Sequence, residues 1–198
     1  DSFAFSYQYD YLVFFYSPYT SEMENLLEAA ENGNVDLLKS IINAKGDIHA
    51  KDDDANTALM LAVTNSSPAC TEVLIDAKAR IDAVNDKKET ALMMAARKGE
   101  TACLKLLIDA KANIHAVNEV GSTALVSAAR EGHADCLQLL IAAKAQLERN
   151  DPHGEWTALM SAVFHDHVTS AELLLAAKAN MNALHENGMT PQIGRAHV

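Results

Sequence analysis

Apolar and polar positions follow a pattern along the chain that returns about every 33 residues. Four segments share it: TALMLAV, TALMMAA, TALVSAA and TALMSAV, which open on Thr57, Thr90, Thr123 and Thr157, and a further Thr stands at Thr190. The apolar residues of each segment fall on one side of a short helix. The Thr hydroxyl can accept hydrogen bonds from the free N–H groups of the first turn. The pattern therefore predicts a Thr-capped helix in every repeat.

A second helix is predicted after each of these. Residues 101–110, TACLKLLIDA, carry apolar side chains at helical spacing, and VLIDAKA, LLIAAKA and LLLAAKA recur at the corresponding places. A polar break such as RKGE or REGH contains a Gly that permits positive φ between the helices. A polar tail such as NIHAVN suits an extended turn into the next repeat. No unit this short can bury its own apolar faces, so two or three must stack.

In these motifs the chain resembles the ankyrin repeat family, whose repeats open on Thr-Pro-Leu-His and end on Gly-Ala-Asp followed by Asn. The resemblance covers residues 24–191 and implies an all-α ankyrin-repeat solenoid of stacked helix-turn-helix units with projecting turn or hairpin fingers. The copies expected from it span residues 24–51, 52–84, 85–117, 118–150 and 151–184, with a partial sixth at 185–191.

The chain departs from that family pattern at three places in each of the four repeats that open on Thr-Ala-Leu. Ala follows the Thr where the family has Pro. The usual His is Met60, Met93, Val126 or Met160, so apolar packing must replace a Thr–His hydrogen bond. The usual Gly after the second helix is Lys, at positions 45, 78, 111, 144 and 178. If the backbone is left-handed there, each Lys costs about 1 kcal/mol relative to Gly.

The two ends differ from the repeats. Nine of the eleven aromatic residues lie in residues 1–22, and the first Met is Met23. Our hypothesis is that Met23 is the natural start and that residues 1–22 are a non-native leader; a disordered aromatic extension is the alternative. Residues 192–198, QIGRAHV, resemble a translated sequencing adapter. We therefore expect the repeat domain to be residues 23–191 and the natural gene to continue past Pro191.

Charge and cysteine content narrow the function classes. A formal net charge of −11 disfavours binding to nucleic acid or to an anionic membrane surface. The apolar run from Tyr11 to Tyr16 is too short to span a membrane. Three cysteines, an odd number, argue against a disulfide framework and fit a reducing compartment. We expect an intracellular, cytoplasmic and monomeric protein.

Several side-chain clusters could suggest chemistry. Cys70, Cys103 and Cys136 recur at one position of three repeats, and the column continues as Leu37 and Ser170. Stacked helices lie about 10 Å apart, whereas a disulfide needs Cα atoms within about 7 Å. We therefore expect this column to be small buried side chains of the second helix.

Other clusters are expected to be surface features. His165 and His167 should lie in a surface loop, and at a spacing of two on a helix they would point apart; weak metal binding is the alternative. Residues 51–56, KDDDAN, lack the Gly and distal Glu of an EF-hand calcium loop. We therefore interpret them as a solvated finger tip or as a contact for a basic partner. The repeated Lys would line one edge as a basic row or as solvated loop residues. Without a phosphate loop or catalytic signature, we expect no catalytic residues, metal or cofactor.

The resemblance implies a concave surface of finger tips and first helices that binds another protein. The candidate contact residues carried over by position are Asp53, Asp54, Asn56, Asp86, Lys87, Glu89, Arg97, Glu119, Val120, Arg130, His153, Glu155, Trp156, Phe164 and His165. Their chemistry predicts a partner that is basic at one end and apolar at the other. The expected function is a non-enzymatic interaction module; a recruiting region of a larger enzyme or channel, or part of a long scaffold, are the alternatives.

Trp156 stands apart from the other candidates. It is the inserted residue that lengthens one interval from 33 to 34 residues. An inserted Trp at a finger is either a binding hot spot or a lid over the first helix of its own repeat.

Overall fold

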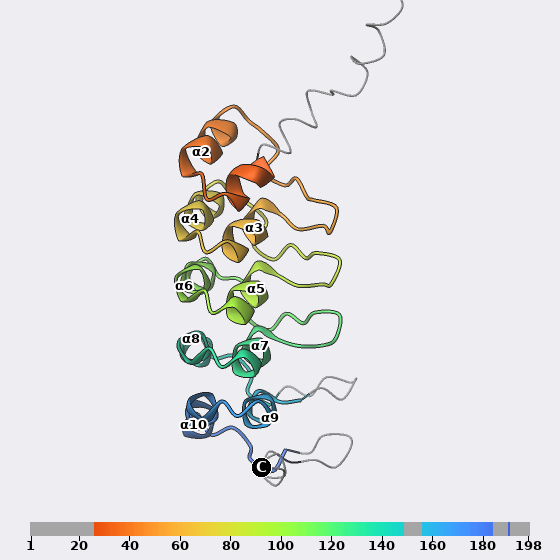
Figure 1. Ribbon diagram of the computed structural model, residues 1–198, viewed down its shortest axis with the longest axis vertical. Helices are drawn as coiled ribbons and strands as arrows, with labels where there is room; N and C mark the ends of the chain where they lie inside the picture. Colours follow the sequence, from red (N-terminus) through yellow and green to blue (C-terminus); the bar gives the residue numbers. More distant parts are fainter. Residues whose placement is uncertain (1–25, 149–155, 184–189, 191–198) are drawn as a thin grey trace, which may run out of the picture.

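The computed structural model describes residues 26–148, 156–183 and 190. In this part, successive helix pairs stack in one row, which confirms the predicted all-α solenoid (Figure 1). The helices after the first helical residues, 26–31, are α2 (Val35–Asn43), α3 (Ala58–Thr64), α4 (Pro68–Asp76), α5 (Ala91–Lys98), α6 (Thr101–Asp109), α7 (Ala124–Glu131), α8 (Ala134–Ala142), α9 (Ala158–Phe164) and α10 (Val168–Ala176).

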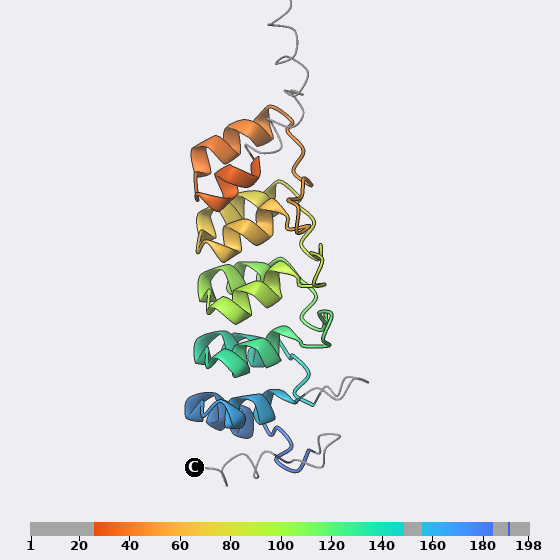
Figure 2. The same cartoon turned by 45° about the vertical axis from the view of Figure 1, so that its right-hand side comes forward.

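The helices form two rows. Helices α3, α5, α7 and α9 make an inner row, and α2, α4, α6, α8 and α10 make an outer row (Figure 1). The loops that join one repeat to the next project along one side of the stack, beside the inner row (Figures 1 and 2). The inner helices and the loops therefore share one surface of the molecule.

The recurrent Thr residues cap the inner helices, as predicted. Each hydroxyl oxygen accepts a hydrogen bond from the backbone N–H three residues on, for example from Met93 to Thr90 at 3.3 Å. The same bond recurs at Thr57, Thr123 and Thr157. A cap of this kind stabilises a helix by about 1 kcal/mol.

A continuous apolar core lies between the two rows. The inner helices bury one Leu each at 2% exposure or less, at positions 59, 92, 125 and 159. The outer helices α4, α6, α8 and α10 each bury a Leu completely at one shared position, 74, 107, 140 and 174, and α6 and α8 bury a second, Leu104 and Leu137. Met60, Met93 and Met160 are buried as well. Apolar packing thus occupies the place where the family usually has a His.

The column that contains the cysteines is buried in four of its five repeats, but one member contradicts the prediction. Cys70, Cys103 and Cys136 are fully buried, and Ser170 is 1% exposed. Leu37, in contrast, is 40% exposed. A member of this column faces the preceding repeat, as the 3.5 Å contact of the Thr71 hydroxyl with the Cys103 sulfur shows. Leu37 belongs to the first repeat, so no described repeat precedes it.

The repeated Lys adopt the left-handed conformation that their register predicts. Lys45, Lys78, Lys111, Lys144 and Lys178 have φ between 64° and 69°. The N–H of Lys111 donates to the Ile108 carbonyl, and the next N–H donates to the Leu107 carbonyl. This pair of bonds is a Schellman motif, which usually places Gly at the left-handed position.

Contacts between successive repeats depend on the residue in the turn between the paired helices. Gly99 has φ 76°, and a Cβ atom there would lie 2.7 Å from the His133 ring. The Nε2–H of His133 donates to the Arg97 carbonyl oxygen at 3.1 Å. Where the turn residue is Ser66 instead of Gly, the next repeat supplies Glu100, which accepts a hydrogen bond from the Ser66 hydroxyl. At Gly99 and Gly132 a Gly in one repeat thus accompanies a His in the next, whereas Gly33 lies against Ser67.

Candidate functional site

The candidate surface begins with three fingers, residues 52–56, 85–89 and 118–122. Each finger is closed by a short side chain at its first residue, because an oxygen of that side chain accepts the N–H four residues on. The distance from the donor nitrogen to the side-chain oxygen is 2.7 Å at Asp52, 2.9 Å at Asn85 and 2.8 Å at Asn118. Short Asp and Asn side chains favour turns of this kind. The fingers are therefore built locally.

Backbone hydrogen bonds also tie each finger to the next. The Asp86 N–H donates to the Asp54 carbonyl at 3.1 Å, and the Glu119 N–H donates to the Lys87 carbonyl at 2.9 Å. These bonds hold the finger tips in a fixed order along the stack. The candidates that the tips expose to solvent are Asp53, Asp54, Asp86, Lys87, Glu119 and Val120.

Four of the candidates are already engaged within the fold. Arg97 pairs with Glu89 at 3.3 Å, and their side chains are 34% and 13% exposed. The side chain of Asn56 accepts a hydrogen bond from Asn85 in the next finger at 3.0 Å. Arg130 is half-buried and pairs with its neighbour Glu131 at 3.4 Å. These groups hold the surface in shape, and the two Arg remain partly open to solvent.

The fifth repeat carries an aromatic cluster. Trp156 is half-buried and packs edge to face on Phe164, with ring centroids 4.3 Å apart. This contact agrees with the lid alternative for Trp156. Phe164 is 60% exposed at the end of α9, so it presents apolar surface to solvent. The candidates His153 and Glu155 lie outside the described residues.

The two His of this repeat lie closer together than a helical spacing implies. His165 ends α9 as its C-cap, and His167 precedes α10 as its N-cap. Their rings are stacked, with centroids 6.2 Å apart and planes 9° from parallel. The expected loop position is thus found, and the helical geometry in which the side chains would point apart does not apply, because the two His cap different helices. The turn between the helices brings them together.

Several other chemistries lack a site in the described residues. Within residues 26–148 and 156–183, no group of three or more His, Cys, Asp or Glu could hold a metal ion. No helix of the described part is long and apolar enough to cross a membrane. Burial raises the pKa of the Cys103 and Cys136 thiols. These two side chains are therefore neutral members of the core and not reactive thiolates.

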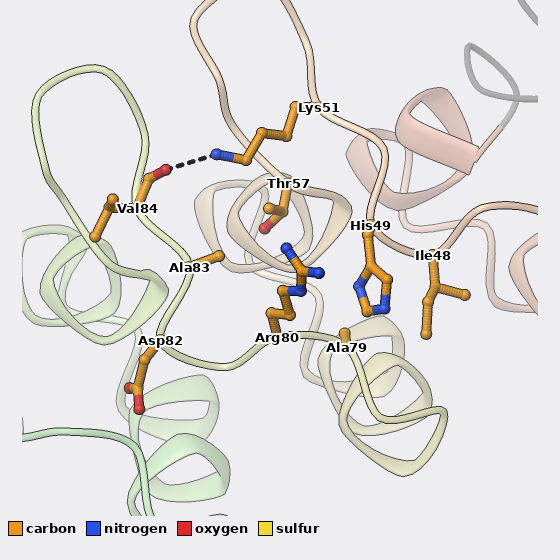
Figure 3. Close-up of a pocket in the computed structure, with 9 residues that line it drawn as sticks. All are labelled: Ile48, His49, Lys51, Thr57, Ala79, Arg80, Asp82, Ala83 and Val84. Atoms are coloured by element: carbon orange, nitrogen blue, oxygen red, sulfur yellow. Dashed lines mark hydrogen bonds between the residues drawn. The ribbon is translucent and has the colours of Figure 1, made fainter.

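The sequence-based candidates omit one feature, a pocket of about 260 Å³ between two loops (Figure 3). The first repeat lines it with Ile48, His49 and Lys51, and the second with Thr57, Ala79, Arg80, Asp82, Ala83 and Val84. Lys51 closes one edge, because its ammonium donates to the Val84 carbonyl at 2.9 Å. Arg80 extends into the middle of the lining residues (Figure 3). The sequence feature that could have indicated this pocket is Arg80, because the same position of the neighbouring repeats holds Asp47 and Asn113.

Comparison with known proteins identifies the repeat. A family model described as ankyrin repeats, in three copies, matches residues 26–118 and again residues 103–185. No curated protein matches the chain.

Proposed function

Because the chain belongs to the ankyrin repeat family, we propose that it binds another protein along the finger–helix surface. This surface comprises the exposed tips of the three fingers and the solvent-facing residues Arg97, Arg130 and Phe164 of the inner helices. Ankyrin repeats are generally non-catalytic modules for protein–protein interaction. The proposed role is therefore recognition and not catalysis.

The observation that carries the proposal is the ordered row of exposed finger tips. Hydrogen bonds between their backbones fix the tips before any partner arrives. A partner then does not have to order these loops, which reduces the entropic cost of association. The side chains at the tips are free to vary, because the finger hydrogen bonds use the backbone and the first side chain.

The partner we propose is basic at one end and apolar at the other. The first finger presents Asp53 and Asp54, both exposed, which favour cations. The fifth repeat presents Phe164, which packs edge to face with Trp156. Aromatic side chains, Phe included, are enriched at protein–protein interfaces relative to the rest of the surface. We propose that Phe164 is the anchor and that Trp156 positions it.

Affinity capture with the full chain tests this function. The bait is compared with two variants, Asp53→Lys/Asp54→Lys and Phe164→Ala, after cross-linking and mass spectrometry. We expect that both changes reduce the captured amount of one and the same protein. That protein should also form cross-links to the fingers. The matched control is Lys105→Glu on the outer helix α6, an exposed position away from the fingers. The proposal would be contradicted if the captured protein no longer bound the control variant but still bound both finger–helix variants.

A further inference from the structure

The loops that follow the outer helices share a hydrogen bond across repeat boundaries. The Asn113 N–H donates to a carboxylate oxygen of Asp82, one repeat earlier, at 2.8 Å. In the last described repeat, the Asn180 N–H donates to a carboxylate oxygen of Glu148 at 2.6 Å. At these two boundaries the chain thus places its own carboxylate against a loop N–H of the next repeat.

The boundary between the first and second repeats lacks this carboxylate. His49 stands in register with Asp82 and Glu148, and Arg80 stands in register with Asn113 and Asn180. Within residues 26–148 and 156–183, no group accepts a hydrogen bond from the Arg80 N–H or from its guanidinium. The position that holds an acid–amide contact at two other boundaries therefore holds an uncompensated cation beside a free N–H. The boundary between the third and fourth repeats carries His115 and Gln146 at these two registers.

The surroundings leave room for an acid from outside. Arg80 and His49 are exposed, and both line the 260 Å³ pocket. Figure 3 shows the Arg80 guanidinium and the His49 ring beside each other, and the Asp82 carboxylate on the side away from them. Asp82 is occupied by its bond to the next repeat. No acid of the lining residues therefore neutralises Arg80.

We propose that this pocket binds an Asp or Glu side chain of another polypeptide. The incoming carboxylate accepts from the Arg80 N–H, as Asp82 and Glu148 do at their boundaries, and from the Arg80 guanidinium. Arginine recognises carboxylates through two parallel, charge-assisted hydrogen bonds. The pocket lies at the foot of the fingers and not at their tips, so this site goes beyond the finger–helix surface.

Two observations favour a carboxylate over a phosphate. Two of the three equivalent places in the same chain hold carboxylates, so the backbone geometry already suits that group. A phosphate also carries more negative charge, and this chain has a formal net charge of −11 with the acidic first finger beside the pocket. A singly charged acid meets less repulsion there.

Titration of the ¹⁵N-labelled full chain, followed by NMR, tests the site. The probes are acetyl-Gly-Glu-Gly-amide, its matched Gln peptide, and inorganic phosphate at equal ionic strength. We expect saturable shifts of the Arg80 backbone amide and side-chain Nε–H with the Glu peptide alone. The Asn113 amide, whose acceptor is Asp82, should stay unchanged. Equal shifts with the Glu and Gln peptides would overturn the proposal, as would saturation by phosphate alone.

Two variants separate a specific site from general charge attraction. His49→Asp should supply the missing carboxylate from within the chain. Because the new carboxylate accepts from the Arg80 N–H, the affinity for the Glu peptide should fall by about tenfold or more. Arg80→Gln should lower the affinity for the Glu peptide by a similar factor. Lys105→Gln removes one charge on α6 and should leave binding unchanged. Retained binding in His49→Asp would refute the shared geometry. None of these outcomes depends on the finger–helix surface, so either proposal can fail alone.

Discussion

Replacing Lys111 by Gly should stabilise the protein. Lys111 has φ 67°, and its exposed side chain has no hydrogen bond or ion pair among the described residues. A left-handed conformation costs an ordinary residue about 1–2 kcal/mol. The extra freedom that Gly gains in the unfolded chain offsets about 0.5–1 kcal/mol of this. The expected increase in the free energy of unfolding is therefore about 0.5–1 kcal/mol.

Lys105→Gly is the matched comparison, because it makes the same chemical change and the same loss of charge inside α6. An exposed Gly in a helix interior costs about 1 kcal/mol, so the two variants should change stability in opposite directions. Urea denaturation of the full chain, followed by far-UV circular dichroism, measures both. The m-value should stay constant, so that the midpoint reports stability. If Lys111→Gly lowers the midpoint as Lys105→Gly does, the left-handed assignment is refuted.

Three further expectations concern other parts of the stack. Gly132→Ala should destabilise by about 2 kcal/mol or more in the same assay, because φ is 75° and the new Cβ would lie 2.5 Å from the His167 ring; an unchanged midpoint would contradict this packing. Thr90→Ala should cost about 1 kcal/mol and Thr90→Ser much less, and equal losses would mean that the hydroxyl does not cap α5. The raised thiol pKa values of Cys103 and Cys136 lower stability only above about pH 8.5, because the unfolded chain then loses these protons first. Urea midpoints measured across that pH should fall less steeply in a Cys103→Ala/Cys136→Ala variant.

The helices and their ends could be predicted because their causes are local. A Thr cap needs a hydroxyl and an N–H three residues away, so the pattern around Thr90 is sufficient to predict it. The left-handed Lys could be inferred because a helix that stops and turns needs such a residue at a defined place. Leu37 was misjudged because a column of similar residues does not show which member lacks a preceding repeat.

The candidate surface was predictable in outline but not in its contacts. A finger bond such as that from Asn56 to Asp52 spans four residues, so the tips followed from the local sequence. The pairing of Arg97 with Glu89 spans eight residues, and it depends on how the finger lies over its helix. The stacking of His165 on His167 depends on the turn that joins α9 and α10.

By itself, the sequence determined the repeat, the caps, the turns and the apolar faces that require stacking, since each arises from interactions within one repeat. Only the tertiary structure decided which residues of neighbouring repeats meet. Gly99 accommodates the ring of His133, and Asp82 caps the Asn113 N–H, across 34 and 31 residues of chain. These residues come into contact only after the helix pairs pack, because the shapes of the buried side chains set the offset between repeats. The uncapped N–H of Arg80 is likewise a feature of two packed repeats and not of one.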